Sequence, residues 1–578
     1  MSRLAVVATL AYVISGAGPG GWAAAAEDAR PVVGRSVVAT ELGIVAASQP
    51  LAARAGVQIL ERGGNAVDAA IAANAAMGLM EPTGNGIGGD LFAIVHLAES
   101  DEILGLNASG WAPEALTVEL LAGQGITEMP RSGIQAVTVP GVVAGWHALR
   151  ERLGTLPFAD LLAPAIHYAE NGFPVSPVTA GGWARSERFL REDSNSAETF
   201  LPGGHAPRAG ELFRNRGLAE SLRRIAERGR DGYYRGETAA AIVAISQEMG
   251  GVMTAADLAD FEPEWVTPIS TTYRGWTVYE IGPNTQGIAA LMMLDLMERF
   301  PIGEYGFHST DALHVMIEAK KLAYADMLHY VGDPRFSRVP VPEMLDKEHA
   351  ARRAQQIDLA RASCSVTPSQ FETVTAIESG DTIYLSVVDR HGNIVSLIQS
   401  NYSGFGSGVV PKGAGFMLHN RGALFTLEPD QPNTLQGRKR PLHTIIPAFM
   451  KKDDAAIGFG IMGGWNQAQA HAQFVSHVVD FGFDIQEALE AGRFTKGTFD
   501  GCDVLLEPLI PEEVRAQLAA RGHEIEVAEP RSSRFGFGQA VQSNGAARGR
   551  AVHLGASEPR HDGAAIPEAP PVFEKGGS

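Results

Sequence analysis

The most constraining feature of this sequence is a pair of β-branched, apolar runs on either side of a short glycine turn. The runs cover residues 382–389 and 394–400, and His391-Gly392 lies between them. Two such runs around a short turn that contains glycine predict an antiparallel hairpin. With His391 and Gly392 as the turn residues, we expect Thr382 to lie opposite Asn401.

The segment before this hairpin has the composition of an exposed linker. Residues 361–380 are polar and rich in Ser and Thr, and no apolar period is sustained there. Thr382 therefore begins a strand directly after a loop, with Ser400 and Tyr402 close by on the second strand. A cut before Thr382 would leave the predicted sheet intact, so we place the main boundary of the chain at this bond.

Composition limits the kinds of partner that the chain can have. Of its 578 residues 45% are hydrophobic and 20% are charged, which is typical of a large globular protein. The formal net charge of -19 argues against a nucleic-acid partner, because phosphate binding needs a basic surface. Helix-like and strand-like runs alternate from Ala39 to about Glu170, which indicates α/β layering. We therefore expect a small-molecule substrate.

The N-terminus resembles a secretory signal. Arg3 precedes an apolar run at residues 4–14, and the small residues 23–26 follow, so we expect a signal peptide over residues 1–26. The alternative is a disordered apolar tail. No later stretch of ~20 apolar residues is present, so we expect a periplasmic or secreted protein without membrane contact after signal removal. Cys364 and Cys502 are the only cysteines, and the sequence leaves open whether they pair.

Glycine motifs stand at two places. Residues 84–89 (GNGIGG) satisfy the GxGxxG pattern, but residues 91–96 after them look like a strand, whereas a dinucleotide fingerprint must open a helix. We interpret these glycines as positions where backbone passes close to another layer. Gly463 and Gly464 end a strand-like run and precede a helix-like one, so their amide N–H groups suit an anion or oxyanion.

Histidine spacing predicts no metal site. His471 and His477 are six residues apart, as are His308 and His314, and no HExxH-type pair is present. We interpret all four as ordinary buried histidines and predict neither a catalytic metal nor a cofactor.

Together these segments resemble the γ-glutamyltransferase family, also called γ-glutamyltranspeptidases or glutathione hydrolases. The resemblance covers nearly the whole mature chain. Its landmarks, in chain order, are residues 61–70 (ERGGNAVDAA), 140–146 (PGVVAGW), 330–334 (YVGDP), the Thr382 hairpin, 440–442 (RPL), Gly463-Gly464 and 557–560 (SEPR). The family fold is the α/β (α+β) N-terminal-nucleophile αββα sandwich. The resemblance also implies one precursor that cleaves itself into a large subunit, 27–381, and a small subunit, 382–578.

The catalytic set of the family has counterparts here. The nucleophilic threonine corresponds to Thr382, its hydroxyl partner to Ser400, and the oxyanion pair to Gly463 and Gly464. A threonine made N-terminal carries its own base, because a free α-amino group has a pKa of ~7.7–8.0. Before cleavage, the same hydroxyl can attack the Asp381 carbonyl to give an ester that water then opens.

The residues that recognise glutamate in the family are replaced. The arginine that clamps the α-carboxylate corresponds to Ser109, and the aspartate that binds the α-amino group corresponds to Leu424. The other pocket positions are Arg421 (a family glutamine), its neighbour Asn420, Tyr402 (an asparagine), and His443 and Thr444 (two serines). Losing a bidentate arginine and a charged partner should cost several kcal/mol of recognition.

The pattern is therefore similar to family branches that process other acids or amides, such as oxamate amidohydrolases and cephalosporin acylases. We predict an amidohydrolase or acyltransferase that acts through an acyl-enzyme on a small amide, acidic enough to pair with Arg421. Two alternatives stand beside it. One is a true glutathione hydrolase, and the other is a catalytically silent homologue that serves as a binding protein.

Overall fold

A computed structural model of the chain describes residues 34–369, 381–545 and 551–572. The expected signal peptide and most of the expected linker, residues 370–380, lie outside these described residues. No helix within the described ranges is long and apolar enough to cross a membrane.

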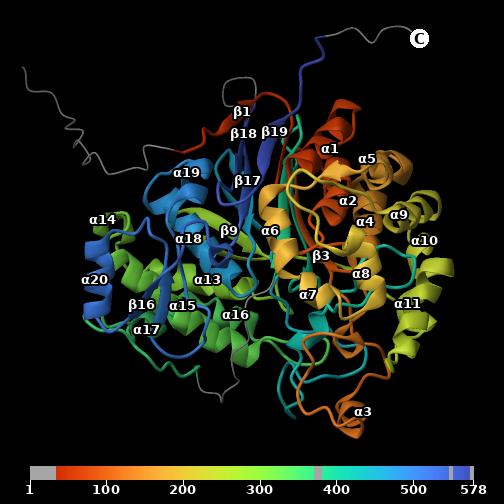
Figure 1. Cartoon of the computed structure of the whole chain (residues 1–578). Coiled ribbons are helices and arrows are strands. Elements are labelled where there is room, and N and C mark those ends of the chain that lie inside the picture. Colours follow the sequence, from red (N-terminus) through yellow and green to blue (C-terminus); the bar gives the residue numbers. More distant parts are fainter. Residues whose placement is uncertain (1–33, 370–380, 546–550, 573–578) are drawn as a thin grey trace, which may run out of the picture. The chain divides into compact units, whose positions relative to one another are not determined.

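Two antiparallel sheets form the centre of residues 34–572 (Figure 1). The first sheet has the order β19 (Ala564–Pro567), β2 (Ile44–Ala47), β10 (Asp381–Val388), β11 (Ile394–Tyr402), β3 (Asp90–Leu97), β4 (Glu102–Ala108) and β7 (Glu264–Val266). The second has the order β1 (Val38–Thr40), β18 (Val552–Ser557), β17 (Gly538–Asn544), β13 (Ala455–Ile461), β12 (Ala448–Lys452), β9 (Trp276–Glu280) and β8 (Ile269–Tyr273).

Alternation along the strands explains why the two sheets stack. Tyr384 and Phe92 of the first sheet pack against Phe449 and Val541 of the second in a buried cluster between the sheets. The next residue along β10, Leu385, faces the opposite way and belongs to the cluster beneath the helices. Side chains of a strand point to opposite faces in turn, so a strand with two apolar faces is buried on both sides.

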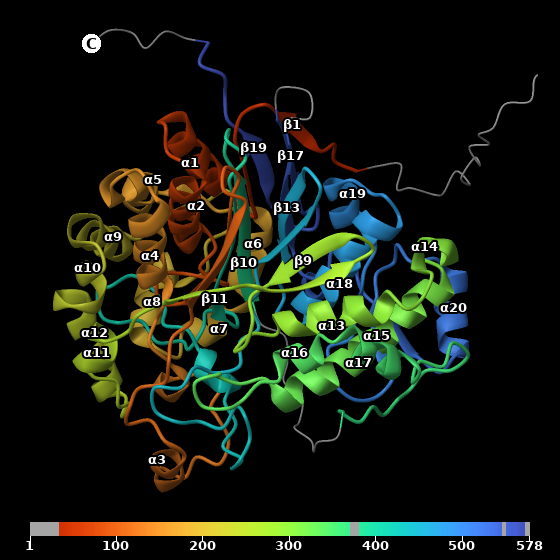
Figure 2. The ribbon, with the colours of Figure 1, turned by 180° about the vertical axis from the view of Figure 1, so that it is seen from behind.

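Helices cover the outer face of each sheet, and the views from front and behind agree on this arrangement (Figures 1 and 2). On the first sheet lie α1 (Pro50–Glu61), α2 (Ala66–Met80) and α4 (Val142–Leu153). On the second lie α13 (Gly287–Met297), α18 (Asn466–Asp480) and α19 (Ile485–Glu490), with α15 (Thr310–Tyr330) packed on α13. Because α2 and α13 are apolar on all sides, each is buried between a sheet and further helices. The expected αββα sandwich is confirmed.

The remaining described elements surround these layers. The helices are α3 (Val118–Gly123), α5 (Phe158–Asn171), α6 (Pro177–Arg185), α7 (Glu187–Leu190), α8 (Ser194–Phe200), α9 (Arg216–Arg228), α10 (Asp231–Tyr234), α11 (Gly236–Glu248), α12 (Ala255–Ala259), α14 (Ile302–Tyr305), α16 (Val341–Met344), α17 (Lys347–Ala354) and α20 (Glu512–Ala520). The small sheets contain β5 (Phe173–Pro174), β6 (Leu212–Phe213), β14 (Phe494–Thr495), β15 (Asp503–Leu506) and β16 (Glu524–Val527).

The hairpin of β10 and β11 is present, but its expected register was wrong by one residue. Val388 pairs with Ile394 and Ile383 pairs with Gln399, so the turn is centred on His391. An irregularity between Asp381 and Ile383 then shifts the pairing, and Asp381 lies opposite Tyr402. Thr382 is at this irregularity. The sequence could not reveal this irregularity, because residues 382–388 are buried on both faces and show no polar–apolar alternation that an extra residue would interrupt.

The two cysteines form a disulfide between Cys364 and Cys502, a pairing that the sequence left open. They lie on opposite sides of residues 370–380 in the chain. The disulfide therefore joins the segment before Thr382 to the segment that follows it.

Candidate functional site

Thr382 lies at the start of β10, on the face of the first sheet that meets the second sheet. Its side chain is buried, and its hydroxyl donates a hydrogen bond to Ser400 Oγ over 3.2 Å. The same Ser400 oxygen accepts the Tyr402 backbone N–H at 2.7 Å. The structure thus brings together the predicted nucleophile and its predicted hydroxyl partner, in a position that burial protects from bulk water.

The glycine-rich segment 84–89 passes directly beside this pair. A Cβ atom on Gly84 would lie 3.3 Å from the Thr382 backbone nitrogen, and one on Gly89 would lie 2.5 Å from the Ser400 carbonyl oxygen. Asn401 N–H also donates to the Gly84 carbonyl at 2.9 Å. Strand β3 follows these glycines, not a helix. Their interpretation as sites of close backbone approach is confirmed.

Arg421 is buried beside Tyr402. It begins the short 3-10 helix η3 (Arg421–Leu424), and its guanidinium carbon lies 4.5 Å from the centre of the Tyr402 ring. Nη1 donates to Thr444 Oγ1 at 2.7 Å, whereas Nε and Nη2 have no hydrogen-bond partner among the described residues. Burial lowers the pKa of Arg421 to about 10, and Asp90 opposes this shift, so the side chain is a cation at neutral pH.

Asp90 and His443 form a second buried pair next to Arg421. His443 Nε2 lies 3.0 Å from Asp90 Oδ2, and Gly110 N–H donates to Asp90 Oδ1 at 2.9 Å. Burial, with Arg421 nearby, lowers the pKa of His443 to about 3, so the imidazole is neutral. Burial alone would raise the pKa of Asp90, but His419, His443 and Arg421 outweigh it and the pKa is lowered. Asp90 is therefore the fixed anion of the site.

Sequence reasoning did not identify Asp90. Its position directly after the glycines, at the start of a predicted strand, could have pointed to it. In the structure Asp90 is the first residue of β3 and pairs with Ser400 on β11. Asp90 and Ser400 thus lie opposite each other on adjacent strands.

Ser109 takes no part in a charged clamp. Its hydroxyl donates to Asn107 Oδ1 at 2.7 Å, and Asn284 Nδ2 lies 3.3 Å from Ser109 Oγ. Asn284 also donates to the Pro441 carbonyl at 2.6 Å. Ser109 is thus bonded to two buried asparagines that sequence reasoning missed, because neither stands in a motif.

Gly463 and Gly464 form the turn between β13 and α18, as expected. Both have positive φ, 123° and 59°, and neither amide N–H donates a hydrogen bond within the described part of the chain. Gln286 Nε2 donates to the Gly464 carbonyl at 2.8 Å and also to the Thr444 carbonyl. Gln286 therefore connects the glycine turn to the residue that bonds Arg421.

The remaining predicted residue, Asn420, uses its amide within the protein. Its Nδ2 donates to the Arg131 carbonyl at 2.7 Å and to Ser403 Oγ at 2.9 Å, while Oδ1 accepts the Ser403 N–H at 3.2 Å. Asn420 thus shapes the segment before Arg421. Most of the predicted residues belong to one connected group, in which contacts run from Thr382 through Ser400, Tyr402, Arg421, Thr444 and Gln286 to Gly464.

One group outside this site has metal-ligand spacing. The ligand atoms of His314, Glu318 and His523 lie within 4.8 Å of one another, and all three residues are buried. His314 Nδ1 and His523 Nε2 are 2.8 Å apart, and Lys321 Nζ already pairs with Glu318 at 2.7 Å. Burial and the Lys321 charge lower the pKa of His523 to about 3. The lysine ammonium supplies the positive charge next to Glu318, which disfavours a metal cation there.

The other histidines singled out by spacing have protein partners. His471 Nδ1 lies 2.8 Å from Glu280 Oε1, and its Nε2 accepts the Ile461 N–H at 2.9 Å. His308 contacts the Gly492 carbonyl, and His477 contacts that of Ala488.

Known proteins match this chain over nearly its whole length. A family model described as gamma-glutamyltranspeptidase matches residues 52–568. The glutathione hydrolase-like YwrD proenzyme of Bacillus subtilis (strain 168) is 34% identical over 537 residues, which are 92% of this chain and 99% of the relative. The oxamate amidohydrolase proenzyme of Klebsiella pneumoniae is 35% identical over 535 residues, with 90% and 98% covered. A crystal structure of cephalosporin acylase from Bacillus halodurans has 43% identity and a TM-score of 0.86, with 92% and 97% covered.

Proposed function

This chain belongs to the gamma-glutamyltranspeptidase family, and we propose that it is an exported precursor that cleaves itself before Thr382 and then removes a small acidic acyl group from an amide. As a family member it is an enzyme of amide hydrolysis or acyl transfer. The proposal adds the cleavage site, the site residues and the substrate class. One observation carries it: Tyr402 connects the buried Thr382–Ser400 pair to a buried arginine, and two donors of that arginine have no partner among the described residues.

Cleavage would begin with the hydrogen-bonded Thr382 hydroxyl. Thr382 Oγ attacks the Asp381 carbonyl carbon, the bond from that carbon to the Thr382 nitrogen breaks, and the hydroxyl proton passes to the nitrogen. Water then opens the ester to give an Asp381 carboxylate and a free Thr382 α-amino group. Ser400 Oγ, held by the Tyr402 N–H, orients the attacking hydroxyl. Two subunits result, residues 27–381 and 382–578, and the names of the relatives as proenzymes support this step.

Turnover would use the new α-amino group as the base. In its neutral form the amine accepts the Thr382 hydroxyl proton while Oγ attacks the substrate amide, and the amine of the substrate leaves with a proton. The acyl-enzyme ester is then opened by water or by an acceptor amine. The N–H groups of Gly463 and Gly464, which have no acceptor among the described residues, suit the negative oxygen of each tetrahedral intermediate.

The substrate class follows from Arg421. The unpartnered Nε–H and Nη2–H lie along one edge of the guanidinium plane, and two parallel donors at this spacing match the two oxygens of one carboxylate. Thr444 and Tyr402 fix the opposite edge and the face of the same group. An acyl group with a terminal carboxylate would therefore satisfy buried donors that no described residue satisfies.

A γ-glutamyl group fits this site less well, because Leu424 stands at the position of the residue that would bind its α-amino group. Leu424 is buried and apolar, and Ser109 is bonded to Asn107. Asp90 is the nearby anion, but its oxygens already accept His443 and the Gly110 N–H. The ammonium of a γ-glutamyl group would be desolvated without a partner, which costs affinity.

Three chromogenic amides test whether the enzyme prefers a simple acidic acyl group or a γ-glutamyl group. Glutaryl-4-nitroanilide has the chain, carboxylate and leaving group of γ-glutamyl-4-nitroanilide but lacks the α-amino group, and butyryl-4-nitroanilide lacks the carboxylate as well. We expect kcat/KM to be at least about 10-fold higher for the glutaryl than for the γ-glutamyl compound, with oxalyl and succinyl anilides included to find the preferred chain length.

Arg421→Met tests the arginine itself. We expect a loss of about 10- to 100-fold on the best acidic anilide and little change on the butyryl compound, because only the former needs the guanidinium. Equal losses on both compounds would mean that Arg421 is structural. Preferred turnover of γ-glutamyl-4-nitroanilide by the wild type would support a true glutathione hydrolase instead, and a matured protein that cleaves none of the amides would support a silent binding homologue.

Export is the remaining part of the proposal. The apolar N-terminal run fits a secretory signal, and the Cys364–Cys502 disulfide fits an oxidising compartment such as the periplasm.

A further inference from the structure

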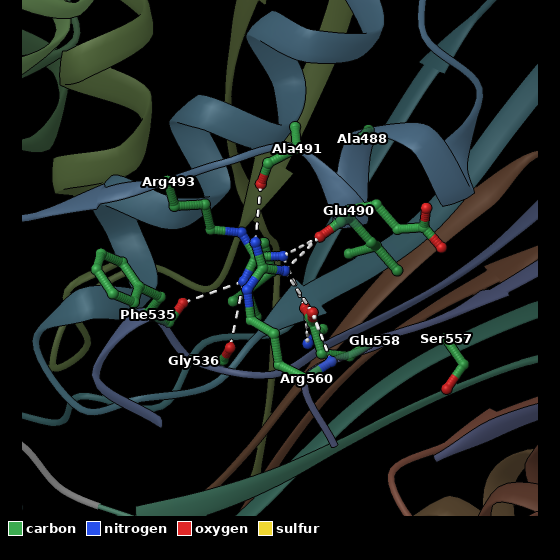
Figure 3. Close-up of polar contacts among 12 residues, drawn as sticks. Ala488, Glu490, Ala491, Arg493, Phe535, Gly536, Ser557, Glu558 and Arg560 are labelled. Atoms are coloured by element: carbon green, nitrogen blue, oxygen red, sulfur yellow. Dashed lines mark hydrogen bonds and ion pairs between the residues drawn. The ribbon is translucent and has the colours of Figure 1, made fainter. Parts of the chain in front are cut away.

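The landmark Ser557-Glu558-Pro559-Arg560 has no role in the site described above, yet its two charged residues are buried. Glu558 lies between two arginines (Figure 3). Its Oε2 pairs with Arg493 Nη2 at 2.7 Å, and its Oε1 pairs with Arg560 Nη1 at 2.5 Å. Arg560 pairs in addition with Glu507 at 2.6 Å. These four residues form the Arg493–Glu558 network.

A buried network of this kind needs an explanation beyond stability. Taking four charges out of water costs several kcal/mol per ion, and the attraction between them often does little more than offset that cost. Burial would raise the pKa of Glu558, but Arg493 and Arg560 outweigh it, so the carboxylate stays charged. The question is which part of the fold the fixed guanidinium groups hold in place.

Arg493 reaches the loop before β17. Its Nη1 donates to the carbonyls of Phe535 and Gly536 at 3.1 Å and 3.2 Å, as Figure 3 shows. Arg560 makes no such contact, because its backbone acceptors are the carbonyls of Leu489 and Ala491 at the end of α19. Within one network, therefore, a single arginine bonds the 535–537 loop.

That loop packs directly behind the glycine turn of the candidate site. The Phe537 carbonyl accepts the Met462 N–H at 3.1 Å. A Cβ atom on Gly536 would lie 1.8 Å from the Met462 carbonyl oxygen, and one on Gly463 would lie 3.3 Å from Gly536 Cα. At these points the backbone of the loop lies directly against the backbone of the turn, so a displacement of the loop is passed on to the turn.

We propose that Arg493 is a positioning residue for the oxyanion donors: Glu558 fixes its guanidinium, the guanidinium fixes the Phe535 and Gly536 carbonyls, and the loop fixes the Gly463–Gly464 turn. The inference rests on the proposed function, because it assumes that these two amide N–H groups stabilise the intermediates. Stabilisation of this kind depends on donors that are held in place before the charge develops, so a turn that moves should slow acylation without weakening substrate binding.

The two arginines supply a matched pair of variants. Arg493→Lys and Arg560→Lys each keep the charge in the same network, but only the first removes bonds to the 535–537 loop. The probe is 4-nitrophenyl acetate, a neutral ester that acylates without needing Arg421, mixed with fully matured protein in a stopped-flow instrument. We expect Arg493→Lys to lower the acylation rate constant by about 10- to 100-fold at an unchanged half-saturation concentration, and Arg560→Lys to lower it by less than about 3-fold. Both variants should lose thermal stability.

The outcomes are distinguishable. Equal acylation rates in the two variants, whether both normal or both slow, would overturn the positioning role, because a purely structural network would affect both alike. If Thr382→Ala were acylated as fast as the wild type, Thr382 would not be the nucleophile. The proposed function and the positioning role of Arg493 would then both be wrong. If Arg493→Lys accumulates as precursor, Glu558→Gln takes its place, with Glu318→Gln as the control that breaks an equally buried ion pair with Lys321. Only Glu558→Gln should then acylate slowly.

Discussion

Two residues of the site set opposite limits on pH. The α-amino group of Thr382 must be neutral to act as a base, and such groups have a pKa of ~7.7–8.0. Arg421 must be charged to bind a carboxylate, and burial lowers its pKa to about 10. Activity on an acidic amide should therefore rise with pH as the amine loses its proton, and fall again as Arg421 loses its own.

A pH profile measures both limits. For the best acidic anilide we expect kcat/KM to be bell-shaped, with an ascending limb near ~8 and a descending limb near 10. Acylation by 4-nitrophenyl acetate should show the ascending limb alone, since that ester has no carboxylate. A descending limb of the same position with both substrates would assign it to some group other than Arg421.

Thr382, Ser400 and the glycine pair were predicted from their correspondence to the catalytic set of the family, and their catalytic roles stay predictions. The structure shows that Thr382 and Ser400 are in contact. Asp90, Asn284 and Gln286 were missed, although they bond His443, Ser109 and the Gly464 carbonyl respectively. They come from two segments that are far apart in the chain, one at residue 90 and one at residues 284–286, and nothing in a single sequence shows that these segments meet near Thr382.

Among the elements, the glycine segment before β3 is the one that most restricts the site. A Cβ atom on Gly89 would lie 2.5 Å from the Ser400 carbonyl oxygen and 2.7 Å from Asn401 Oδ1. Strand β11 would have to move next to Thr382. We expect Gly89→Ala to lower the free energy of unfolding by about 1–3 kcal/mol and to slow the appearance of the cleaved subunits.

Gly123→Ala is the matched control. Gly123 ends α3, and a Cβ atom there would meet nothing within 4 Å, so the variant should mature normally and be as stable as wild type or up to about 1 kcal/mol more stable. Chemical denaturation and a maturation time course on gels measure both effects. If Gly89→Ala matured normally and were as stable as the wild type, the glycine segment 84–89 would accept a Cβ atom without cost, and the prediction would be wrong.

The hairpin shows how far element-scale prediction reaches. Periodicity identified both strands and the turn, but the register was off by one from Val388 to Ile383. Five residues, 389–393, lie between the paired Val388 and Ile394, whereas a two-residue turn leaves an even number of residues between each pair. The irregularity near Thr382 restores the expected offset only at Asp381. Since turn length and bulges are decided by hydrogen bonding, the pattern of side chains could not reveal either.

For the molecule as a whole, the disulfide determines whether the two subunits stay covalently joined after cleavage. Cys364 precedes Thr382 and Cys502 follows it, so a cut before Thr382 leaves the two subunits joined covalently. We expect the matured protein to run as one band on a denaturing gel without reductant and as two bands with it. Cys364→Ser should give two bands under both conditions and should lower the melting temperature, because a cross-link that constrains the unfolded chain is lost. Two bands from the wild type without reductant would contradict the pairing.

The layered architecture was predictable from the family landmarks and their order along the chain. The cysteine pairing was not, because two cysteines far apart in sequence give no sign of their distance in space.

The central claim is that this chain becomes an enzyme by cutting itself before Thr382, and mass spectrometry of two purified proteins tests it most directly. Wild-type protein, reduced and denatured, should give two chains, one of which begins at Thr382. Thr382→Ala, prepared in the same way, should stay a single chain, because it lacks the hydroxyl that attacks the Asp381 carbonyl. An alanine variant cut at the same bond, or a wild-type protein that stays whole, would contradict the account.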